Sequence, residues 1–62
     1  MYSEDQLSIA HDFTAALAEA LAQATPAHVG AVRQARMKAE QLPDELYRLA
    51  VQAAFQAAGL SN

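Results

Sequence analysis

The sequence predicts an all-α fold: three helices in a small helical bundle, forming one domain over residues 1–62 and completed by homodimerisation. Alanine, the strongest helix former, is the commonest residue, whereas Gly and Pro occur only twice each. Strand-forming residues are few and do not alternate. A chain of this size buries a small core, and without cysteine it has no disulfide to reinforce that core. Oligomerisation is the remaining way to stabilise it.

The first helix is predicted over about 4–24. Ser3 is a good N-cap, and Gln6 three residues later completes a capping box. Tyr2 and Leu7 have the spacing of a hydrophobic staple across this helix start. Apolar and small residues then recur at alternating steps of three and four, which predicts a seam that packs on another helix. This seam consists of Leu7, Ala10, Thr14, Leu17, Leu21 and Ala24.

The second helix is predicted over about 26–41. Thr25 is a plausible N-cap, and Pro26 fits the first helical position because its missing N–H has no partner there. Gly30 weakens the helix interior by about 1 kcal/mol relative to alanine. We interpret it as a place where another helix crosses closely. The exposed side carries a basic face of Arg33, Arg36 and Lys38.

The third helix is predicted over about 43–58, with Pro43 at its first position and Gly59 as a left-handed C-terminal cap. Phe55 and Leu60 fall at the two positions whose side chains meet in a Schellman motif. Residues 61 and 62 would be a short frayed tail. This helix is apolar nearly all round, a property typical of buried helices.

A chain of 62 residues has difficulty burying such a helix on every side by itself. Its apolar residues divide into two stripes, one containing Tyr47, Val51 and Phe55, the other Leu46 and Leu49. We expect one stripe to pack within the chain and the other to contact a second chain. The predicted protein-interface residues are Leu46, Tyr47, Leu49, Val51, Ala54, Phe55 and Leu60.

The charges are segregated along the chain. Residues 1–25 contain four carboxylates and no basic residue, whereas residues 26–42 have a local excess of two positive charges. We expect these two segments to face each other across a bundle rim or a dimer contact. The alternative is a dimeric helix-turn-helix-like DNA-binding regulator that uses Arg33, Arg36 and Lys38. The net charge of −3 and the acidic start of the third helix argue against it.

Nothing in the sequence indicates an enzyme. His11 and His28 are isolated, and the chain has no phosphate-binding loop, nucleophile motif or metal-ligand spacing. We therefore expect no catalytic residue, no cofactor and no metal. No apolar run approaches the length of a membrane span, and the acidic N-terminus is unlike a signal peptide. We expect a cytoplasmic protein with no membrane contact.

The predicted function is a non-enzymatic role in protein–protein contacts. The small size, the all-helical design and the lack of a catalytic motif are similar to small adaptor or anti-activator proteins of bacteria and their phages. This likeness is to a class of proteins and attaches to no particular residue. Together with the homodimer expected from the two stripes, it implies an adaptor or modulator, of the anti-activator or inhibitor type, of a bacterial or phage regulatory protein.

Overall fold

The computed structural model describes residues 1–60 and contains three helices: α1 over Glu4–Ala22, α2 over Pro26–Ala39 and α3 over Asp44–Ala57. The all-α prediction is confirmed, and no strand occurs in the described residues. The predicted ends differ from these bounds by one or two residues. The predicted tail at 61 and 62 lies outside the described part of the chain.

Local hydrogen bonds explain where the helices begin. The Ser3 side chain accepts from the Gln6 backbone N–H at 3.1 Å, and the Gln6 side chain accepts from the Ser3 N–H at 3.0 Å. The predicted capping box is therefore present. Thr25 caps α2 by accepting from the His28 N–H at 3.2 Å. Pro43, predicted as the first helical residue, is instead the N-cap of α3, whose own side chain supplies no capping hydrogen bond.

The end of α3 is a Schellman motif, as the sequence predicts. Gly59 has a φ of +75°, in the left-handed region that favours glycine. The Leu60 N–H donates to the Phe55 carbonyl at 2.8 Å, and the Gly59 N–H donates to the Gln56 carbonyl at 3.0 Å. These two bonds satisfy carbonyl groups at the helix end and fix the chain after it.

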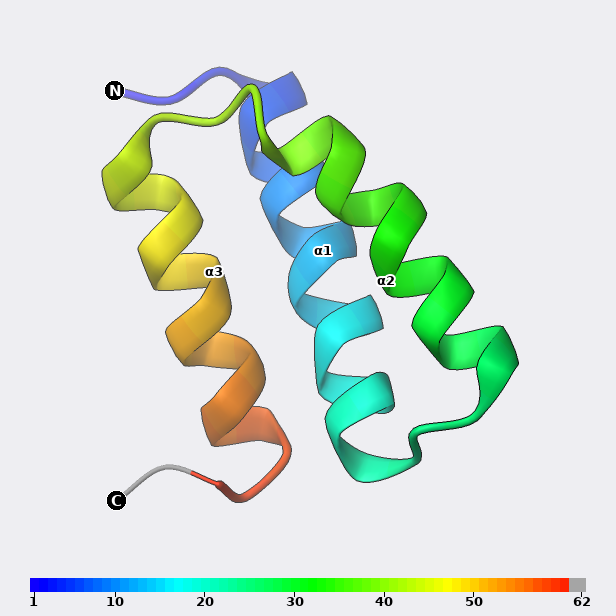
Figure 1. Cartoon of the computed structure of the whole chain (residues 1–62). Helices are drawn as coiled ribbons and strands as arrows, with labels where there is room; N and C mark the ends of the chain where they lie inside the picture. Colours follow the sequence, from blue (N-terminus) through cyan, green and yellow to red (C-terminus); the bar gives the residue numbers. More distant parts are fainter. Residues whose placement is uncertain (61–62) are drawn as a thin grey trace.

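α1 is the centre of the arrangement. Both α2 and α3 pack against α1, whereas α2 and α3 barely contact each other (Figure 1). The Cα trace accordingly extends 33 × 26 × 15 Å, and its short dimension shows a shallow, open arrangement. The predicted close crossing at Gly30 is wrong, because no atom of another helix in residues 1–60 lies within 4 Å of the place where its Cβ would be.

The core is concentrated at one end of the molecule. We call this the closed end; it contains the N-terminus and the α2–α3 connection (Figure 1). The Phe13 and Tyr47 rings stack there with centroids 5.2 Å apart. Thr14 donates from its hydroxyl to the Ala50 carbonyl at 3.1 Å, joining α1 to α3. The buried cluster consists of Ala10, Phe13, Ala39, Leu42, Leu46 and Ala50.

The opposite end, which we call the open end, contains the α1–α2 turn and the C-terminal end of α3 (Figure 1). Its only buried residue in the described chain is Ala54.

None of the three helices is long and apolar enough to cross a membrane, a finding that applies to residues 1–60.

Candidate interaction surface

The structure separates the seven predicted interface residues into three groups. Leu46 and Ala54 are buried, with 6% and 0% of their surface exposed. Tyr47 and Val51 are half-buried against the core cluster. The remaining three are exposed: Leu49 at 49%, Phe55 at 39% and Leu60 at 52%.

Leu46 and Ala54 must therefore be corrected from interface residues to core residues of their own chain. The reason is the position of α1 on α3. α1 does not cover the whole of either predicted stripe; it packs across the boundary between them, on a face that includes Leu46, Ala50 and Ala54. Part of each stripe consequently remains uncovered.

These uncovered parts form two edges of α3. At 100° per residue, Leu49 and Ala53 lie on one side of the face that contacts α1, and Val51 and Phe55 lie on the other. Ala57 lies closer to the middle of that face, but it follows the last buried residue, Ala54, and extends the exposed surface of Leu49 and Ala53 by one turn. We call the two sides the Leu49 edge and the Phe55 edge. The Leu49 edge is exposed at all three positions, whereas Val51 on the Phe55 edge is half-buried. The two edges can contact different partners because they face different directions.

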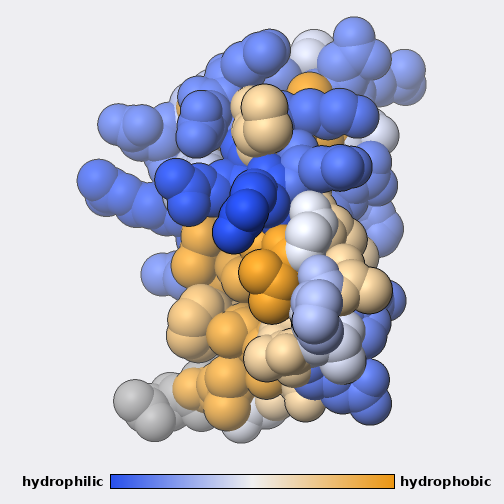
Figure 2. All heavy atoms as spheres, turned by 45° about the vertical axis from the view of Figure 1, so that its right-hand side comes forward, coloured by the Kyte–Doolittle hydropathy of each residue, from blue (hydrophilic) through white to orange (hydrophobic). Residues whose placement is uncertain are grey.

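Apolar side chains from all three helices gather at the open end. Figure 2 shows apolar surface in the lower half of its view, extending from the C-terminal end of α3 towards α2. These side chains are half-buried or exposed rather than enclosed. We define the open-end patch as the two large apolar residues that each helix contributes there: Leu17, Leu21, Val29, Val32, Val51 and Phe55.

The border of the open-end patch is basic. Arg33 and Arg36 follow Val29 and Val32 by four positions on α2, so each pair is adjacent on the helix surface. Arg48 precedes Val51 by three positions on α3. Among residues three or four positions from a patch residue, the charged ones are these three arginines. Strongly hydrophilic side chains lie directly above the apolar surface in Figure 2.

The predicted basic face of α2 is divided. Arg33 and Arg36 lie beside the open-end patch, and Arg36 forms an exposed ion pair with Glu40 at 3.8 Å. Lys38 lies roughly 140° or more around the helix from both arginines. It instead borders an open depression of about 220 Å³ between α1 and α2, which Asp12 also lines. The three cations therefore form no continuous surface.

The predicted attraction between the acidic first helix and the basic second helix is represented by a single ion pair in the described residues. Within residues 1–60, the only ion pair between α1 and α2 joins Glu19 to His28, with Oε2 and Nε2 3.8 Å apart. This contact carries charge on both sides only when the imidazole is protonated. No Arg or Lys side chain of α2 is paired with a carboxylate of α1 in this part of the chain.

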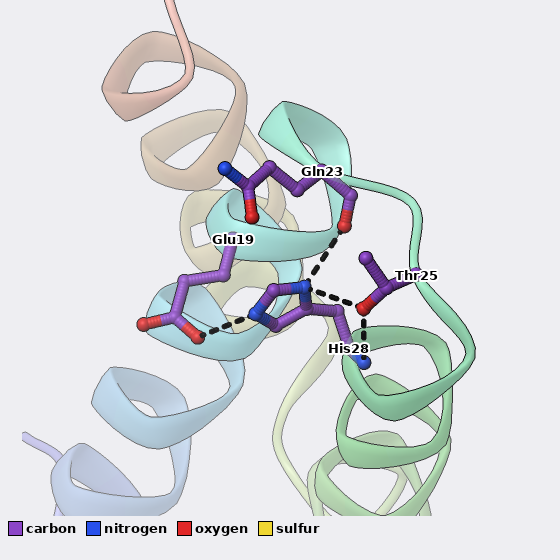
Figure 3. Close-up of polar contacts among 4 residues, drawn as sticks. All are labelled: Glu19, Gln23, Thr25 and His28. Atoms are coloured by element: carbon purple, nitrogen blue, oxygen red, sulfur yellow. Dashed lines mark hydrogen bonds and ion pairs between the residues drawn. The ribbon is translucent and has the colours of Figure 1, made fainter.

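His28 closes the α1–α2 turn (Figure 3). Its Nδ1 lies 3.0 Å from the Gln23 carbonyl oxygen and 2.9 Å from the Thr25 hydroxyl. Because a carbonyl oxygen only accepts, the contact with Gln23 requires a hydrogen on Nδ1. The ring therefore ties the end of α1 to the start of α2, and we assign His28 a structural role.

The described residues show no arrangement suited to metal binding, since no group of three or more His, Cys, Asp or Glu side chains converges. A second open depression, of about 370 Å³, lies beside His28 and is lined by Glu19, Ala22 and Gln23. Its polar groups are mostly committed to the turn just described. The open-end patch and the Leu49 edge are thus the main candidates for function.

Sequence reasoning missed the contributions of α1 and α2 to this surface. Leu17 and Leu21 were expected to be covered as part of the α1 seam, yet both are half-buried. The available signal was the spacing of Val29 and Val32 to Arg33 and Arg36. It places a basic border along an apolar strip of α2.

No protein-family model, curated protein or solved structure matches this chain.

Proposed function

We propose that this chain is a non-enzymatic helical protein that acts through protein–protein contacts. Its role would be that of a homodimeric adaptor or modulator, of the anti-activator or inhibitor type, for a bacterial or phage regulatory protein. The observation that supports this proposal is that the core consists mostly of small side chains, whereas many large apolar side chains lie on the surface. Among residues 1–60, four of the seven buried residues are alanines, while seven large apolar side chains are exposed.

The size of the chain adds to this argument. A single core in so small a domain rarely supplies more than about 3–5 kcal/mol, and alanine contributes little apolar area to it. Burying Leu49, Phe55 and Leu60 against other chains would remove a large apolar area from water. Exposed apolar patches of this kind are typical of interaction sites.

We assign self-association to the Leu49 edge. Its two alanines allow the backbones of neighbouring helices to approach closely, and Leu49 provides a large apolar contact. A symmetric dimer would place α3 against the α3 of its partner, and twofold dimers are the commonest oligomers. The Phe55 edge would remain open in such a dimer.

Light scattering at micromolar concentration tests the self-association. The expected mass is about twice that of the 6.6 kDa chain. Leu49→Glu should reduce the mass to that of one chain, because it introduces a charge into the proposed contact. Ser8→Glu adds the same charge on the exposed side of α1 and should leave the dimer intact. A wild-type mass of 6.6 kDa would show that the homodimer is wrong.

The DNA-binding alternative has less support. In a helix-turn-helix the second helix enters the major groove, presented by a compact pair of packed helices. Here α2 and α3 barely contact each other, and Lys38 lies apart from Arg33 and Arg36. Retention on heparin that weakens steeply with salt would favour this alternative over the protein-contact proposal.

A further inference from the structure

The open-end patch extends over three helices of which only α1 packs on both others. α1 forms its floor, and α2 and α3 flank that floor without packing on each other (Figure 1). Three neighbouring helices of this kind occupy three of the four positions in a four-helix bundle. A fourth helix laid over the patch would complete the bundle and cover all six apolar side chains. The shape therefore favours a helical partner.

The charge on the border specifies the chemistry of that helix. The chain has a net charge of −3, yet all three of its arginines border the open-end patch. Arg33 and Arg48 have no ion-pair partner among residues 1–60, and the Arg36–Glu40 pair is exposed on both sides. Arginine binds carboxylates through two parallel hydrogen bonds and is enriched in protein interfaces.

We propose that the open-end patch binds an amphipathic helix of a partner protein, whose apolar stripe is flanked by aspartate or glutamate. This inference rests on the proposed function and specifies the partner that the adaptor recognises. The apolar stripe would lie over Leu17, Val32 and Phe55. Its carboxylates would meet Arg33, Arg36 and Arg48 at the border.

A second copy of this chain fits the patch less well. In a symmetric dimer the same surface meets itself, so the arginine border of one patch would face the other. The acidic outer side of α1, with Asp12 and Glu19, could supply carboxylates. However, its central positions are polar or alanine, so it lacks the large apolar anchors that the patch would require.

Two labelled synthetic peptides test the proposal. Each would form a helix of about 18 residues, or five turns, with the same leucine stripe. One carries glutamate beside the stripe and the other carries lysine. Fluorescence anisotropy with the full chain should show the acidic peptide binding about tenfold more tightly, the effect expected from three modest ion pairs. The preference should shrink as salt rises.

Matched variants locate the binding site. Arg33→Gln combined with Arg48→Gln should abolish most of the preference for the acidic peptide. Lys38→Gln removes a positive charge elsewhere on α2 and should preserve it. Phe55→Ala should weaken both peptides, whereas Leu49→Ala, on the other edge of α3, should weaken neither. Circular dichroism would confirm that each variant keeps its helices.

Equal binding of the two peptides, or binding of neither, would overturn the acidic-helix proposal. A dimer that Phe55→Glu dissociates and Leu49→Glu does not would also overturn it, because a second copy would then occupy the patch. These results differ from failure of the proposed homodimer, which light scattering of the wild-type chain measures without any peptide.

Discussion

The closed end and the open end are built from the same three alanine-rich helices, yet only the closed end has an enclosed core. At the closed end, the α2–α3 connection holds the two helices over α1, and Phe13, Leu42 and Leu46 fill the space between them. At the open end, no connection joins α2 to α3. The apolar side chains there are of similar type but lack a covering layer.

The difference indicates that the closed end supplies most of the free energy of unfolding, whereas the open end leaves its apolar side chains available for a partner. Large side chains that face a neighbouring helix contribute to the free energy of unfolding. Those that face solvent contribute little to the isolated chain and remain available for a partner. Mutations of matched residues at the two ends should therefore have different effects on stability.

The largest expected contrast is between the two phenylalanines. Phe13→Ala should reduce the free energy of unfolding by about 3–5 kcal/mol, enough to unfold a domain with so small a core. Phe55→Ala removes a side chain that is 39% exposed and should cost much less. Urea unfolding followed by circular dichroism would measure both. Similar losses at the two positions would contradict the distinction between the ends.

A second contrast uses two alanines of α3. Ala50 is buried, and its carbonyl accepts from Thr14, so Ala50→Leu would overpack the contact between α1 and α3. The expected cost is about 1–3 kcal/mol. Ala53→Leu adds the same atoms on the exposed Leu49 edge and should be nearly neutral. A large cost for Ala53→Leu at concentrations where the chain is a monomer would contradict the placement of α1.

Replacing the two glycines by alanine should change the free energy of unfolding in opposite directions. Gly30→Ala meets no atom within 4 Å and should stabilise α2 by up to about 1 kcal/mol through its helix propensity. Gly59→Ala places a side chain at a φ of +75° and should cost about 1 kcal/mol or somewhat more. Thermal unfolding of both variants would reveal the signs. A destabilised Gly30→Ala would mean that another segment lies close to α2.

The smallest expected effect is a pH dependence at the closed end. Partial burial, followed by the negative charge of Glu45, raises the pKa of the Tyr2 hydroxyl above its ordinary value of 10.0. The folded state therefore holds this proton more tightly, and the resulting stability is complete below about pH 10 and lost as pH rises further. Tyr2→Phe should reduce that alkaline loss in unfolding experiments between pH 8 and 11. An unchanged profile would contradict this assignment.

The sequence by itself determined the helices and, to within one or two residues, their ends. The helix ends are fixed by hydrogen bonds between residues at most five positions apart. These bonds join Ser3 to Gln6, Thr25 to His28, Gly59 to Gln56 and Leu60 to Phe55. Such signals do not depend on how the helices pack. Composition predicted the all-α class, and the helical pattern of residues predicted the excess of apolar residues on α3.

Only the tertiary structure decided which apolar residues are covered. Leu46 and Leu49 belong to one predicted stripe, yet the first is buried and the second is exposed. Their fates depend on where α1 lies on α3, a contact between residues more than thirty positions apart, as Thr14 and Ala50 illustrate. Helical periodicity specifies which residues share a face, but it does not specify where a neighbouring helix sits on that face. The two edges of α3, and the common border that Arg48 forms with the arginines of α2, became visible only once that position was known.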